Sequence, residues 1–73
     1  MIINIHCIQF KHLSKFVSIK TIDNRKIGKI YYDHKNVGWM WKFTYMLFEY
    51  KGTKFHSTWT QSKEELLDFL KSK

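Results

Sequence analysis

Few residues of this chain have the chemistry of a metal site. The candidate thiolate and imidazole ligands are Cys7, His6, His12, His34 and His56. Structural zinc sites use such residues in closely spaced pairs, for example C-x2-C with H-x3-H, and the sequence contains no such pair. His6 and Cys7 are neighbours, and neighbouring residues of a strand point to opposite faces. We therefore expect no metal site.

A catalytic centre is not indicated either. A cysteine nucleophile needs a base held beside it, whereas Cys7 stands at an apolar position of an alternating stretch, which predicts an inert core thiol. The six acids lie in predicted turns or in the carboxy-terminal segment, at spacings that do not predict a convergent pair. With only three glycines, the chain has no glycine-rich phosphate loop. We expect a protein that is not an enzyme and that carries no cofactor.

The charge of the chain suggests an acidic partner. The formal net charge of +7 favours nucleic acid, an acidic protein surface or anionic lipid. Arg25 is the one arginine, and alanine and proline are absent, a pattern that an AT-rich genome would also produce. Arginine is the usual bidentate reader of guanine, so its scarcity disfavours base-specific recognition of duplexes but not contacts with phosphates.

An alternating stretch at residues 37–49 indicates where such a partner could bind. Large and mostly apolar residues stand at the odd positions from Trp39 to Leu47, and a mixed set that includes Lys42 stands at the even positions. A period of two is typical of a long β-strand that buries one face. We predict that one side of this strand builds the core and that the other side stays open.

The open side of the predicted sheet is both basic and aromatic. The residues that we predict to form a binding surface there are Lys20, Lys29, Tyr31, Lys42, Met46, Phe48, Lys54 and His56, together with Thr44. Lysines that track a phosphate backbone and rings that stack on bases are typical of proteins that bind single-stranded nucleic acid. Two alternatives stay open, because exposed methionine and phenylalanine also suit a protein interface, and a solvated sheet face carries lysines without any partner.

Further strands are predicted ahead of this stretch. The predicted strands lie at residues 2–8, 16–22 and 27–33. The predicted turns lie at residues 23–26 and 34–38. Residues 10–15 are compatible with one helical turn or with a loop, and they are too few to decide between the two.

Gly52 indicates how the long strand pairs with the segment after it. In a three-residue loop that ends at Gly52, glycine takes the left-handed position that it tolerates without strain. Leu47 would then face Phe55, and Phe43 would face Trp59, so that all large apolar residues share one side. A two-residue loop of Lys51 and Gly52 would shift the pairing by one residue and move this set to the other side. Burial therefore favours the three-residue loop of Tyr50, Lys51 and Gly52.

The last segment predicts an amphipathic helix. Ser62 and Glu65 match a capping box, and Leu66, Phe69 and Leu70 fall on one stripe. A helix on one face of a four- or five-stranded antiparallel meander gives an α+β fold, in a single domain of 73 residues. The predicted core consists of Ile3, Ile5, Val17, Ile19, Ile30, Tyr32, Trp39, Trp41, Phe43, Leu47, Phe55, Trp59, Leu66, Phe69 and Leu70.

The order of three strands and one helix over residues 27–70 resembles the small DNA-binding domains of the AP2 type and the arm-binding domains of phage integrases. The resemblance is one of topology, and it implies a sheet that lies in the major groove of DNA. Such domains use several arginines and an alanine-rich helix face, and this chain has one arginine and no alanine.

The expected setting is the cytoplasm. A single cysteine cannot form an intramolecular disulfide, which suits a reducing compartment, and the apolar runs are too short to span a bilayer. We predict a small basic binding protein that engages nucleic acid or nucleic-acid machinery, and no membrane. The alternative is a viral or phage accessory protein that inhibits or modulates a host protein by direct docking, and a homodimer is a third class.

Overall fold

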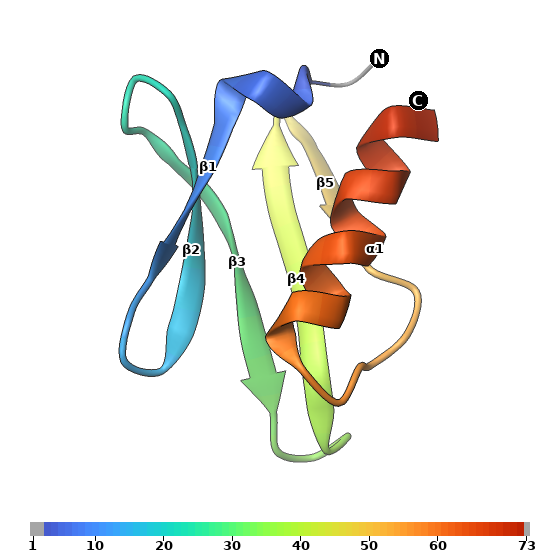
Figure 1. Ribbon diagram of the computed structural model, residues 1–73. Coiled ribbons are helices and arrows are strands. Elements are labelled where there is room, and N and C mark those ends of the chain that lie inside the picture. The colour runs from blue at the N-terminus through green and yellow to red at the C-terminus, as the bar shows by residue number, and fades with distance from the viewer. Residues whose placement is uncertain (1–2, 73) are drawn as a thin grey trace.

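The chain folds as an antiparallel sheet covered on one face by a helix. The computed structural model describes residues 3–72. The elements in chain order are η1 (Ile5–Cys7), β1 (Ile8–His12), β2 (Phe16–Thr21), β3 (Lys26–Asp33), β4 (Gly38–Tyr45), β5 (Phe48–Lys51) and α1 (Trp59–Ser72). Each strand pairs with the next in the order β1-β2-β3-β4-β5, which confirms the predicted α+β meander (Figure 1).

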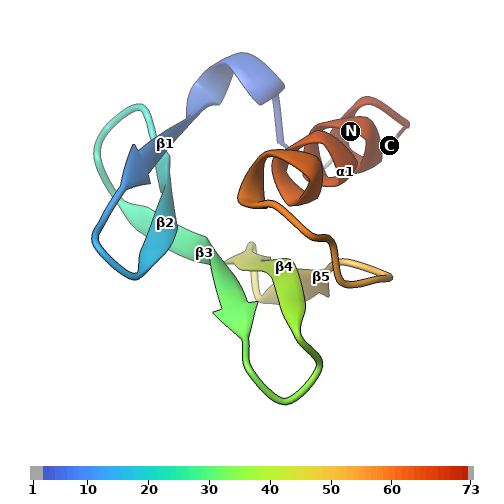
Figure 2. The same cartoon turned by 60° about the horizontal axis from the view of Figure 1, so that its bottom comes forward.

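The core lies between the sheet and the helix. Figure 2 shows the sheet as a curved layer with α1 on its inner side, where the helix contacts mainly β4 and β3. The most deeply buried side chains include Ile30 and Trp41 from the sheet and Leu66 and Leu70 from the helix. Within residues 3–72, no helix has the length and apolar character needed to cross a bilayer.

The predicted first strand was wrong in position. Its residue Ile2 lies outside the described residues, and residues 5–7 form the 3-10 turn η1 instead of a strand. The Asn4 side chain accepts a hydrogen bond from the backbone N–H of His6 at 2.8 Å, which starts this turn. The strand follows at Ile8–His12, so the undecided residues 10–15 contain the end of β1 and the turn into β2.

The long strand predicted at residues 37–49 is in fact a hairpin. The chain reverses at Met46 and Leu47, and Tyr45 pairs with Phe48. Both turn residues have positive φ, 52° and 69°, as a type I′ turn requires. That turn usually carries Asn-Gly, so Met-Leu gave no signal for it in the sequence. The reversal turns Phe48 toward the same side as Tyr45, and Leu47 is 99% exposed instead of lying in the core.

Gly52 does not form the predicted three-residue loop. Its N–H donates to the Trp41 carbonyl at 3.0 Å, and a Cβ at position 52 would come within 2.8 Å of the indole nitrogen of Trp41. Glycine is therefore needed for this close approach, not for a left-handed turn. The segment after it crosses Trp39 at His56, so Phe55 points to the opposite side and does not face Leu47.

The helix begins earlier than predicted. The hydroxyl of Thr58 accepts from the N–H of Gln61 at 3.2 Å, and the Gln61 side chain accepts from the N–H of Thr58 at 3.3 Å. These reciprocal bonds form a capping box that starts α1 at Trp59. Trp59 is thus a helix residue and not the strand partner of Phe43, and Ser62 is a buried position in the helix interior.

Candidate nucleic-acid interface

The sheet has one face that α1 does not cover, which we call the open face. Directly opposed residues of paired strands lie on the same side of a sheet. Ile30 pairs with Trp41, and both are buried beneath the helix. The next pair along, Lys29 with Lys42, therefore belongs to the open face.

Three lysines stand side by side across this face. Lys29 of β3 is opposite Lys42 of β4, and Lys42 is opposite Lys51 of β5. We call these three residues the lysine row. Adjacent strands are about 4.8 Å apart, so the row places three like charges in register over a short distance. Lys20 and Lys26 form a second opposed pair, because a register shift after Ile19 brings them together.

The acids of the protein lie mostly elsewhere. Glu64, Glu65 and Asp68 are on α1, on the other side of the sheet. Among the described residues, the one ion pair within 4.0 Å joins His56 to Glu65. Glu49, opposite Thr44, is the acid nearest to the lysine row in the strand pairing. The positive charge of the open face is therefore left largely unbalanced.

The acids at the two turns are occupied by their own turns. The backbone N–H groups of Lys35 and Asn36 donate to Asp33 at 2.9 and 3.1 Å, and the Asn36 N–H is the main cause of the lowered pKa of this carboxyl. The hydroxyl of Thr21 donates to Asp23 and is the main cause that lowers the pKa of Asp23.

Two aromatic rings accompany the lysines. Phe16 of β2 is opposite Tyr31 of β3 on the open face. The Lys29 ammonium lies 5.4 Å from the centre of the Phe16 ring and 5.5 Å from that of Tyr31. Lys26 approaches Phe16 at 4.9 Å, and Lys42 approaches Tyr31 at 5.4 Å. These cation–π contacts place charge directly beside rings that α1 does not cover.

Four of the eight predicted site residues are brought together on the open face. They are Lys20, Lys29, Tyr31 and Lys42. Their role in binding stays a prediction, since geometry alone establishes only their common location.

The other four predicted site residues lie away from this surface. Met46 and Phe48 are at the β4–β5 turn, 73% and 65% exposed, and Phe48 is on the helix side of the sheet because the chain reverses before it. Lys54 lies in the segment before α1, where it lines a hollow together with acids of the helix. His56 also faces the helix.

Glu65 explains why His56 is held on the helix side. Its carboxylate lies 2.7 Å from the ring nitrogen Nε2 of His56 and accepts from both the N–H and the hydroxyl of Thr53, each at 2.8 Å. Glu65 thus fastens the segment after β5 to the helix. His56 is part of this structural clamp, and its imidazole does not reach the open face.

The sequence interpretation missed Phe16, Lys26 and Lys51. Phe16 could have been found, because it alternates with Val17 and precedes Lys20 by an even number of residues. Lys26 was assigned to a turn, and its position opposite Lys20 depends on an irregularity that leaves no pattern in the sequence. Lys51 joins the row only because the turn at Met46–Leu47 resets the alternation.

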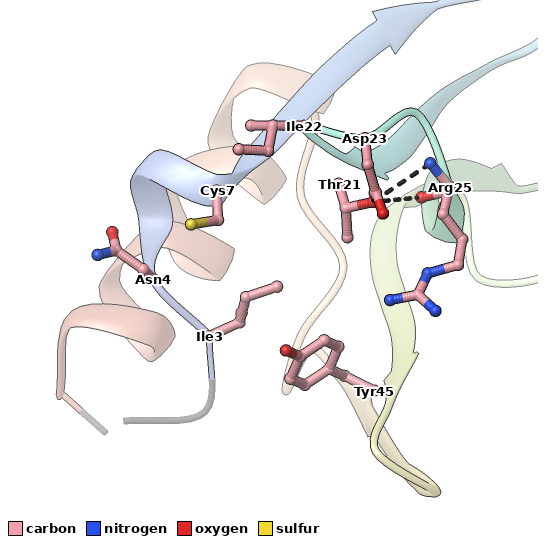
Figure 3. A pocket seen from close by; sticks show the side chains of 8 residues that line it. All are labelled: Ile3, Asn4, Cys7, Thr21, Ile22, Asp23, Arg25 and Tyr45. Atoms are coloured by element: carbon pink, nitrogen blue, oxygen red, sulfur yellow. Dashed lines mark hydrogen bonds between the residues drawn. The ribbon is translucent and has the colours of Figure 1, made fainter.

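A hollow of about 460 Å³ lies at the end of the sheet, apart from the open face (Figure 3). Thr21 bonds to the backbone of Arg25, and the Arg25 guanidinium extends toward Tyr45. No group of three or more His, Cys, Asp or Glu within residues 3–72 could hold a metal ion. Arg25 supplies an exposed cation to the lining of this hollow.

Comparison of the chain with protein-family models, with curated proteins and with solved structures found no match.

Proposed function

We propose that this protein binds nucleic acid through the open face of its sheet. The observation that carries the proposal is the lysine row, in which Lys29, Lys42 and Lys51 oppose one another on three adjacent strands. Like charges directly opposite each other destabilise a sheet. The phosphates of a polyanion lying on the row would attract the three ammonium groups and offset the repulsion between them.

Base composition alone does not account for the row. An AT-rich genome would raise the number of lysines, but it would not by itself align three of them across adjacent strands. The acids Glu64, Glu65 and Asp68 lie on α1, which also carries Lys63 and Lys71. The alignment of three lysines on adjacent strands is what favours a ligand. The proposed partner is nucleic acid, free or within a complex of nucleic acid with protein.

The expected recognition is through phosphates. Lysine ammoniums contact phosphate oxygens and release condensed counterions, so affinity falls as salt rises. The only arginine, Arg25, is in the turn at the end of the sheet and not on the open face, so the usual reader of guanine is missing there. We therefore expect the affinity to depend weakly on base sequence. The proposed function involves no chemical step and no cofactor, and the proposed setting is the cytoplasm.

A salt series tests the proposal. A fluorescently labelled oligonucleotide of random sequence is titrated with the protein by anisotropy, at several salt concentrations. Three phosphate contacts on a single strand predict a slope of log K against log salt of about −2. A slope near zero, or no binding at low salt to either DNA or RNA, would contradict the proposal.

Docking to another protein is the second candidate, and a different surface favours it. Met46, Leu47 and Phe48 form an exposed apolar tip at the β4–β5 turn, and Ile22 at the neighbouring turn is 67% exposed. Clusters of exposed apolar side chains tend to mark contacts. This candidate corresponds to a viral or phage accessory protein that modulates a host protein.

The two candidates separate in a pull-down treated with nuclease. A stoichiometric protein partner that survives nuclease, is lost with Met46→Asn/Leu47→Gly and is kept with Lys42→Gln would favour docking through the tip. Self-association is examined separately by analytical ultracentrifugation, in which a homodimer would appear as a concentration-dependent change in sedimentation.

A further inference from the structure

The open face carries two parallel rows of side chains with different chemistry. One is the lysine row, Lys29, Lys42 and Lys51. The other, which we call the apolar row, consists of Phe16, Tyr31 and Met40, opposed to one another across β2, β3 and β4. Met40 is 7% exposed, so the half-buried rings of Phe16 and Tyr31 supply the accessible surface of this row. Tyr31 follows Lys29 by two residues, and Met40 precedes Lys42 by two, so the rows are about 7 Å apart along the strands.

This spacing matches the two sides of one nucleic-acid strand. The phosphate and the base of a nucleotide lie on opposite sides of the sugar, so a strand that crosses the sheet can meet both rows at once. We infer that the open face selects single-stranded nucleic acid, with phosphates on the lysine row and unpaired bases stacked on Phe16 and Tyr31. This inference rests on the proposed function and adds the class of nucleic acid.

The cation–π contacts are compatible with such stacking. Lys26, Lys29 and Lys42 hold their ammoniums 4.9–5.5 Å from the two ring centres in the unbound protein. A base stacked on an aromatic ring is worth more than an exposed cation–π contact, so a base can displace an ammonium from the ring. The displaced ammonium then lies beside the phosphate of the same strand.

A duplex cannot use the apolar row. Its bases are stacked and paired inside the helix, so it can offer the open face only phosphates, and the face lacks the arginine that would read base edges in a groove. The inference therefore differs from groove binding, which the topological resemblance of residues 27–70 implied. It predicts a preference for single strands over the duplex of the same sequence.

The test compares a strand of thymidines with an abasic strand of the same length and charge. The wild-type protein should bind the thymidine strand about tenfold more tightly, which corresponds to about 1.4 kcal/mol. Phe16→Leu and Tyr31→Leu should each reduce this advantage while leaving affinity for the abasic strand unchanged. Phe48→Leu is the matched control, because it removes an exposed ring from outside the open face and should retain the advantage.

The outcomes distinguish the inference from the proposed function. Equal affinity of the wild-type protein for the two strands, or equal affinity for the single strand and its duplex, would overturn the inference and leave phosphate binding in place. Failure to bind either strand would overturn both. Circular dichroism tests whether each leucine variant is folded. If a variant is unfolded, the comparison of strands with the wild-type protein still tests the preference for unpaired bases.

Discussion

The two faces of the sheet are built from the same strands and have opposite properties. Beneath α1, Trp41 stacks on Phe43 with ring centres 5.7 Å apart, and Phe69 of the helix lies 5.3 Å from Trp41. On the open face, the neighbouring residue Lys42 lies between two other lysines. Because stability comes from the covered face, the open face can keep a repulsive arrangement of charge. A ligand that binds the open face, as proposed above, would account for this contrast.

The largest expected effect separates the two faces at adjacent residues of β4. Trp41→Ala should reduce the free energy of unfolding by about 3–5 kcal/mol, because it leaves a cavity at a side chain that is 1% exposed. Lys42→Ala, one residue away, should change it little or raise it slightly by relieving repulsion. Chemical denaturation of both variants measures the difference. Equal losses would mean that both faces are structural.

Glu65 offers a test of how the covered face is closed. Glu65→Ala should cost about 1–2 kcal/mol, because it removes the acceptor for Thr53 and the partner of His56. Burial alone would raise the pKa of Glu65, but the Thr53 N–H, the His56 ring and the Thr53 hydroxyl together bring it below its ordinary value of 4.5.

The lowered pKa of Glu65 gives this clamp a defined pH dependence. Its contribution is complete above the ordinary value of 4.5 and is lost as the pH falls through the lower pKa of the folded state. Thermal melts from pH 6 to pH 3 should therefore fall less steeply for Glu65→Gln than for the wild type. Parallel curves for the two proteins would show that the clamp does not contribute.

The β4–β5 turn decides which residues reach which face, and its backbone is strained. Met46 and Leu47 both have positive φ, which residues other than glycine and asparagine adopt at a cost. Replacing them with Asn-Gly should raise the free energy of unfolding by about 1 kcal/mol. A loss of stability in denaturant titrations would mean that the chain does not reverse at these residues.

The start of α1 is tested by two hydroxyl deletions. Thr58→Ala should cost about 1 kcal/mol, because it removes the N-cap acceptor of Gln61. Ser62→Ala should be neutral or slightly stabilising, since the Ser62 hydroxyl is buried without a hydrogen-bond partner. The opposite ranking in urea unfolding would restore the later helix start that the sequence predicted.

The sequence was sufficient for the architecture and for part of the candidate site. Alternation placed Lys29, Tyr31 and Lys42 on one face, and the apolar stripe of the helix is observed at Leu66 and Leu70. Alternation fails where the chain reverses without a turn signal, as it does at Met46–Leu47. The side of the sheet that alternation assigned to each residue after Leu47 was therefore unreliable.

Local competition accounts for the remaining errors. Two capping patterns follow one another, one from Thr58 to Gln61 and one from Ser62 to Glu65, and propensity alone does not rank them. The structure uses the first because it lengthens the helix and leaves Glu65 free to clamp Thr53 and His56. The start of the helix is therefore determined by tertiary contacts, which a local sequence pattern does not contain.

The most direct test of the contrast between the faces compares two triple variants of equal charge. One replaces Lys29, Lys42 and Lys51 with glutamine. The control replaces Lys35, Lys54 and Lys71, which are exposed and lie outside the open face. Each lowers the formal net charge by three from +7, so only the location of the lost charge differs.

The measurement is the affinity of both variants for one labelled single strand across a salt series. We expect the variant of the lysine row to lose at least tenfold in affinity and its salt slope to flatten by about 2, while the control stays close to the wild type. Equal losses in the two variants would show that net charge alone attracts nucleic acid, and would contradict a binding site on the open face.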